Sequence, residues 1–157
     1  MMYSKNMSSE IASAERPAFI VRIQVEQLFG RYDYDLNPDG GTDPSNLMLL
    51  YGDNGSGKTT LLKLIYALLS THGNRGLKTY ISTVPFRSLA IRFNDGTDVE
   101  AIREKGETAG EYTMSVRRPG HSSTICKFEP GMTRDPAYPK FLREMDGLGV
   151  AFYYLSD

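Results

Sequence analysis

The stretch GDNGSGKT at residues 52–59 decides the fold class of this chain. It is a complete G-x-x-x-x-G-K-[ST] pattern. The apolar run 47–51 precedes it, and the run 60–70, which has helical periodicity, follows it. A strand, a glycine-rich turn and the N-terminus of a helix form the context in which this pattern binds phosphate. The sequence therefore predicts a phosphate-binding loop between a central strand and a helix.

Each part of the predicted loop has a chemical role. Its glycines let the backbone fold tightly enough for N–H groups to surround phosphates. The following helix points the positive end of its dipole at the same place. Lys58 is expected to reach the β- and γ-phosphates, and Thr59 to ligate Mg²⁺ through its hydroxyl. The residues predicted to bind ATP and Mg²⁺ are Gly52, Asn54, Gly55, Ser56, Gly57, Lys58, Thr59 and Thr60.

The composition excludes several other classes of protein. With 157 residues the chain has the length of one domain, and 40% hydrophobic residues suffice for a core. The net charge of -1 gives no general attraction for nucleic acid. The one cysteine, Cys126, excludes an internal disulfide, and we expect it to be a small buried hydrophobe. No apolar stretch approaches the roughly 20 residues of a membrane span, so we expect a cytoplasmic protein.

Residues 1–16 are polar, and we expect them to form a disordered tail before a domain at 17–157. Strict alternation of apolar and polar residues over 19–26, resumed over 32–36, predicts a β-hairpin. After the loop, the helix 60–70 should end near residues 72–76, where glycine supplies a left-handed cap. Its expected apolar face consists of Leu61, Leu62, Ile65, Leu68 and Leu69.

The second half of the chain predicts an antiparallel meander of about four strands. One hairpin spans 88–103 around an Asn-Asp-Gly turn, and another spans 111–128 around a Pro-Gly-His turn. A short helix over 138–145 and a final apolar strand over 150–155 complete the expected elements. The expected fold class is α/β, with a central strand–loop–helix unit and an antiparallel meander.

A phosphate loop alone does not hydrolyse ATP. Hydrolysis also needs an aspartate at the end of a second apolar strand and a group that orients the attacking water. After the loop, only the run 150–157 is apolar and ends in an acidic residue, Asp157. Three interpretations stay open: a Mg²⁺-positioning aspartate, an earlier strand that ends at a loop facing the γ-phosphate, and a plain core strand. The catalytic residues are unknown from the sequence.

Residues 51–65, YGDNGSGKTTLLKLI, closely resemble the loop and first helix of ABC-type P-loop ATPases. In that superfamily an antiparallel sheet and a further strand follow, in the order expected for residues 88–155. The resemblance implies that 17–157 is the N-terminal portion of an ABC-type ATPase domain. The segment from Leu28 to Tyr51, which leads to the loop, is short. In this it resembles the RecF-like and chromosome-maintenance-like branch, which includes "AAA family" ATPases that act in DNA repair or phage defence. The alternative is a transporter subunit, and it is weakened because no glutamine follows Val150.

In this superfamily two protomers sandwich ATP, and one of them contributes a Leu-Ser-Gly-Gly-type signature. No such signature is visible in the sequence. The resemblance therefore implies that a second protomer or a C-terminal half completes the site. It also implies an ATPase that acts through ATP-driven dimerisation and hydrolyses ATP in the complete assembly, whereas this chain alone binds ATP with negligible turnover. The alternative is a module that binds ATP without turnover.

Several weaker candidates have two interpretations each. For Tyr32 and Tyr34, one interpretation is that the ring stacks on adenine, and the other is a half-buried tyrosine in a strand. Arg22 faces the nucleotide or is a solvated strand residue. A loose basic grouping faces DNA or is ordinary surface charge. That grouping consists of Arg117, Arg118, Lys127 and Arg134; we expect His72 and His121 to be loop residues.

Overall fold

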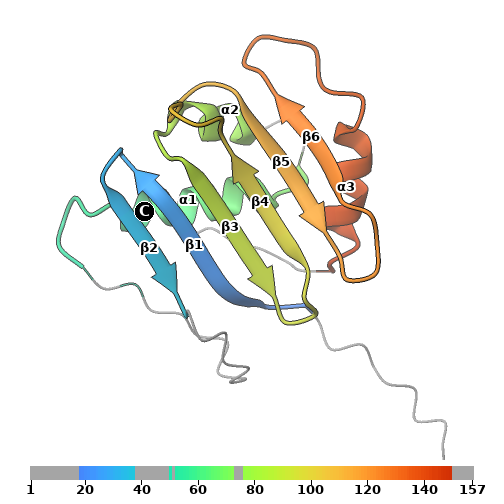
Figure 1. Ribbon diagram of the computed structural model, residues 1–157, viewed down its shortest axis with the longest axis horizontal. Helices are drawn as coiled ribbons and strands as arrows, with labels where there is room; N and C mark the ends of the chain where they lie inside the picture. Colours follow the sequence, from blue (N-terminus) through green and yellow to red (C-terminus); the bar gives the residue numbers. More distant parts are fainter. Residues whose placement is uncertain (1–17, 38–49, 51, 73–75, 150–157) are drawn as a thin grey trace, which may run out of the picture.

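The computed structural model describes residues 18–37, 50, 52–72 and 76–149. Within them the chain forms a six-stranded antiparallel sheet, and three helices pack on one of its faces (Figure 1). The strand order is β2-β1-β3-β4-β5-β6. The strands are β1 (Ile20–Leu28), β2 (Tyr32–Leu36), β3 (Ser88–Phe93), β4 (Asp98–Ile102), β5 (Tyr112–Arg117) and β6 (Thr124–Phe128); the helices are α1 (Lys58–Leu69), α2 (Leu77–Thr83) and α3 (Tyr138–Asp146).

The three predicted hairpins are confirmed. β1 pairs with β2, β3 with β4, and β5 with β6, each antiparallel. The Asn-Asp-Gly turn closes the second hairpin with Gly96 at φ +82°, and a Cβ there would lie 2.9 Å from Cγ of Pro119. The turns of the second and third hairpins therefore pack against each other. The short helix predicted over 138–145 is confirmed as α3.

Alternation along the strands builds the core. In β1, Val21, Ile23 and Val25 are buried, whereas the residues between them are half-buried. Side chains alternate between the faces of a sheet, so one face is apolar and packs on the helices. The apolar face of α1 is nearly as predicted, with Leu61, Ile65, Leu68 and Leu69 buried. Leu62 was wrongly predicted there: it is 45% exposed, and Leu64 is buried in its stead.

The predicted glycine cap of α1 is wrong. The helix ends at Leu69, before the glycines, and the next residue, Ser70, is extended (φ −68°, ψ 130°). The last carbonyls are instead bound by the buried ammonium of Lys78, which donates to the oxygens of Ala67 (2.7 Å), Leu68 (2.6 Å) and Ser70 (3.2 Å). Burial lowers the pKa of Lys78 to about 7.

Helix α2 was not predicted. Gly76, at φ +64°, is the residue before α2 and not the cap of α1. Tertiary contacts hold α2 in place: the buried guanidinium of Arg103 donates to the carbonyls of Ile81 and Phe86, each at 2.8 Å, and the Tyr112 hydroxyl donates to the carbonyl of Lys78 at 2.8 Å. The helix is thus tied to the residue that follows β4 and to the first residue of β5.

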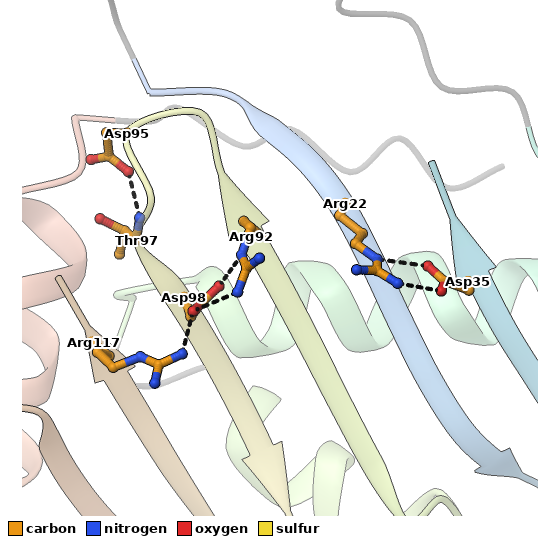
Figure 2. A network of polar contacts seen from close by, with 7 residues as sticks. All are labelled: Arg22, Asp35, Arg92, Asp95, Thr97, Asp98 and Arg117. Carbon is orange, nitrogen blue, oxygen red and sulfur yellow. Dashed lines mark hydrogen bonds and ion pairs between the residues drawn. The ribbon is translucent and has the colours of Figure 1, made fainter. Parts of the chain in front are cut away.

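The opposite face of the sheet carries a row of ion pairs across the strands (Figure 2). Asp98 on β4 accepts hydrogen bonds from Arg92 on β3 at 2.7 Å and from Arg117 at the end of β5 at 2.6 Å. Arg22 on β1 donates to Asp35 on β2 at 2.6 and 2.9 Å. Arg22 is therefore a strand residue on the face away from the helices, which agrees with the second of its two interpretations.

Part of the predicted fold lies outside the described residues. This applies to the tail 1–16, to the central strand 47–51 apart from Leu50, and to the strand 150–155 with Asp157. The sheet that is described is antiparallel throughout. The structure therefore describes the loop and the helix of the expected strand–loop–helix unit. The parallel strands typical of proteins with a phosphate-binding loop are not part of the described sheet.

Candidate functional site

The loop 52–57 leads into the N-terminus of α1 through two glycines in the left-handed region. Gly55 has φ +85° and Gly57 has φ +88°. Side chains disfavour this conformation, so glycine is required by the backbone path. Gly57 also has no room for a side chain, because a Cβ there would lie 2.9 Å from Cδ2 of Leu28 and 3.0 Å from Cε2 of Phe29. The loop thus folds tightly against the tip of the β1–β2 hairpin.

The N-terminus of α1 is suited to an anion. The first N–H groups of a helix have no partner within the helix, and they lie at the positive end of its dipole. Many helices satisfy them with a capping side chain or an acidic residue. α1 has no side-chain cap hydrogen bond and no acidic residue in its first turn. Its N–H groups and its dipole therefore remain available to a phosphate group.

Lys58 lies within the curl of the loop. Its ammonium donates to the carbonyl oxygens of Gly52 at 2.5 Å and Asp53 at 2.7 Å, and to Oγ of Ser56 at 3.3 Å. None of these contacts is with a carboxylate, so the charge of the ammonium is not neutralised by them. The loop thus brings a cation, a helix N-terminus and glycine backbone to one place.

Thr59 and Thr60 follow Lys58 in the first turn of α1. Thr59 is exposed, and Thr60 is half-buried. A threonine hydroxyl can supply one oxygen ligand of Mg²⁺, whose other positions are then taken by oxygens of water or of a bound group. Asn54 and Gly52 are exposed on the loop. No group of three or more His, Cys, Asp or Glu side chains within the described ranges could hold a metal by itself.

The aromatic residues beside the loop agree with the second of their two interpretations. Tyr32 and Tyr34 are half-buried strand residues, with ring centroids 6.2 Å apart and planes at 21°. The Tyr34 hydroxyl donates to the carbonyl of Ser56 within the loop. The exposed aromatic ring beside Gly57 belongs to Phe29, which is 40% exposed and which the sequence did not single out. Its one sequence signal is the Phe-Gly pair at the expected hairpin turn.

The cations of the loose basic grouping, for which DNA contact was one of two interpretations, all have partners within the chain. Arg117 pairs with Asp98 at 2.6 Å, and Arg118 with Glu144 at 3.4 Å. Lys127 pairs with both Glu111 (3.2 Å) and Glu129 (3.1 Å), and the guanidinium of Arg134 lies 5.2 Å from the centroid of the Tyr138 ring. These contacts agree with ordinary surface charge.

The remaining predicted residues fit structural roles. Cys126 is buried at 1% exposure, and burial raises the pKa of its thiol to about 11, as expected of a small hydrophobe. His72 follows the end of α1, and His121 lies in the turn between β5 and β6, where its Nδ1 is 3.0 Å from the carbonyl of Pro119. None of the helices in the described part of the chain is long and apolar enough to cross a membrane.

The family model described as "AAA domain, putative AbiEii toxin, Type IV TA system" matches residues 47–147. The matched region begins just before the phosphate loop and runs to the end of α3. It therefore includes the loop, all three helices and strands β3 to β6. No curated protein matches the chain.

Proposed function

The chain belongs to this AAA-domain family, and on that premise we propose that residues 52–60 bind the triphosphate of ATP together with Mg²⁺. Members of the family carry a nucleotide-binding, ATPase-type domain of the P-loop class. The observation that supports the proposal is the place of Lys58 inside the loop, at the start of a helix with no acidic residue in its first turn.

Each binding residue has a role in this proposal. The N–H groups of Gly55, Gly57 and Lys58 face the phosphate chain, and the ammonium of Lys58 meets the terminal phosphates. Thr59 supplies the hydroxyl ligand of Mg²⁺, and Thr60 adds a hydrogen bond to the phosphate nearest the sugar. Phe29, beside Gly57, is the exposed ring that the base meets.

The binding proposal is tested by titrating Mg·ATP into the wild-type chain and into Lys58→Ala. A hydrogen bond to a charged group contributes about 1.5–3 kcal/mol, so we expect the dissociation constant to rise about 10- to 100-fold. The matched control is Lys63→Ala, which removes the same charge from an exposed position further along α1. Equal affinities of the wild type and Lys58→Ala would overturn the proposal.

We also propose that the ATPase site is completed by a second protomer or by a further segment that brings the catalytic groups. One support is the resemblance to ABC-type ATPases, in which two protomers share each ATP site. The other is that no hydrogen bond or ion pair among the described residues connects Lys58 to a carboxylate. The isolated chain should accordingly bind ATP and release phosphate no faster than Lys58→Ala does. Rapid phosphate release by the isolated wild-type chain would contradict the composite site.

The process in which the ATPase acts is proposed to be phage defence, with DNA repair as the alternative. The support is the family description, which names a toxin–antitoxin system. Phage should form fewer plaques on cells that express the wild-type protein than on cells that express the Lys58→Ala variant. Equal plaque numbers together with DNA-stimulated phosphate release would favour the repair role instead.

A further inference from the structure

The β1–β2 hairpin touches the phosphate loop at two points. Leu28 and Phe29, at its tip, fill the space beside Gly57, where a Cβ would lie 3.0 Å or less from either side chain. On the other strand, the hydroxyl of Tyr34 donates a hydrogen bond to the carbonyl oxygen of Ser56. Both contacts fall on one peptide unit of the loop, the one that joins Ser56 to Gly57.

The tip of this hairpin is itself held in place. The N–H of Phe29 donates to the carbonyl of Pro85 at 2.8 Å, and the N–H of Gln27 donates to Oδ1 of Asp33 at 2.6 Å. Gln27 and Phe29 both have positive φ, +52° and +56°, and Gln27 lies where the pairing register of β1 and β2 shifts. Non-glycine residues enter this region at a cost, so these hydrogen bonds maintain an otherwise unfavourable path. The loop is thus supported by a fixed structure.

The Tyr34 contact determines how the Ser56–Gly57 peptide is turned. A trans peptide unit is planar, and its C=O and N–H point in opposite directions. Because the carbonyl points to Tyr34, the N–H of Gly57 points away from the hairpin. That N–H directly precedes the first residue of α1, where the helix dipole favours an anion.

We propose that Tyr34 is a positioning residue of the phosphate site. Its hydroxyl fixes the Ser56–Gly57 peptide so that the Gly57 N–H meets the phosphate chain, and its ring, half-buried against Tyr32, does not contact the base. This inference rests on the proposed binding of a triphosphate by residues 52–60. It assigns Tyr34 to recognition of the phosphates, whereas adenine stacking would assign it to recognition of the base.

The test compares Tyr34→Phe, which keeps the ring and removes the hydroxyl, with Tyr32→Phe. The Tyr32 hydroxyl makes no hydrogen bond to residues 52–59, so Tyr32→Phe is a matched control on the same strand. Dissociation constants are measured for Mg·ATP and for Mg·tripolyphosphate, which has no base. Circular dichroism verifies that both variants fold.

Tyr34→Phe should raise both dissociation constants by the same factor, about five- to tenfold, and Tyr32→Phe should leave both within about twofold of the wild type. Unchanged affinities in Tyr34→Phe would overturn the inference and leave the phosphate site standing. A loss with ATP and none with tripolyphosphate would also overturn it, because that result assigns Tyr34 to the base. If the wild type binds neither ligand, the proposed function itself fails.

Discussion

Asp98 shows how single residues stabilise the open face of the sheet. Its side chain is only 10% exposed and accepts hydrogen bonds from two arginines on neighbouring strands (Figure 2). Burial alone would raise the pKa of its carboxyl, but the hydrogen bonds from Arg92 and Arg117 outweigh burial and hold the pKa below its usual value. The ionised form is therefore favoured in the folded protein.

This pKa direction predicts a dependence of stability on pH. A carboxyl whose pKa is lowered by folding stabilises the fold above the unfolded-state pKa, near 4, and loses that contribution as the pH falls through the folded-state value. Asp98→Asn should therefore be less stable than the wild type at pH 7, and the difference should shrink below about pH 4. Urea unfolding over this pH range measures it.

Asp35→Asn is the control for that measurement. The Arg22–Asp35 pair is more exposed, with side-chain exposures of 28% and 38%, and exposed pairs contribute little to stability. We expect the smaller change at pH 7 in Asp35→Asn. A difference for Asp98→Asn that stays constant from pH 7 to pH 3 would show that Asp98 acts through packing and not through its charge.

The two helices that follow left-handed glycines differ in what surrounds those glycines. Gly57 precedes α1 and Gly76 precedes α2, with φ of +88° and +64°. A Cβ at Gly57 would lie 2.9 Å from Leu28, which is fully buried, whereas a Cβ at Gly76 would meet nothing within 4 Å. Alanine substitutions at these two glycines therefore separate the free energy of backbone strain from that of a steric clash.

Gly76→Ala should lower the free energy of unfolding by about 1 kcal/mol, because alanine disfavours positive φ. Gly57→Ala should cost a further 1–3 kcal/mol or so, because Leu28 and Phe29 must move, and it should also weaken ATP binding. Thermal unfolding and an ATP titration of both variants measure these effects. Equal losses of stability would mean that the loop is not packed on the hairpin.

Elements governed by local sequence were predictable, and those governed by distant contacts were not. The Asn-Asp-Gly turn and the alternation in 19–26 specify hairpins by themselves. Helix α2 contains Thr79, Ile81 and Thr83, whose β-branched side chains have modest helix propensity. Its helical state depends on Lys78 and Arg103, whose bonding partners are remote in sequence. No local pattern contains that information.

The same distinction applies to the site. The tight loop before α1 was predictable because the pattern fixes glycines, a lysine and a threonine at set spacing; its binding of phosphate stays a prediction. Phe29 was not singled out, and the contact of Tyr34 with the loop was not predicted, because both depend on how the hairpin packs against the loop. Their contribution is geometric, and it becomes visible only in three dimensions.

On the scale of the whole molecule, the described residues form an antiparallel sheet with helices on one face (Figure 1). The loop 52–57 lies at the N-terminal end of α1, beside the β1–β2 hairpin. The hairpin and the first helix converge on that loop. On the sheet's other face, ion pairs join β1 to β2, and β4 to both β3 and β5. We therefore assign binding to the loop end of the molecule.

The most direct test of the central claim is to locate ATP on the chain by NMR, in ¹H–¹⁵N spectra recorded as Mg·ATP is added. The account predicts that the largest shifts fall on the backbone amides of residues 52–60, with Gly55, Gly57 and Lys58 foremost, and that Lys58→Ala abolishes them at the same ATP concentration. Shifts that cluster elsewhere in the chain, or an unchanged response in Lys58→Ala, would contradict it.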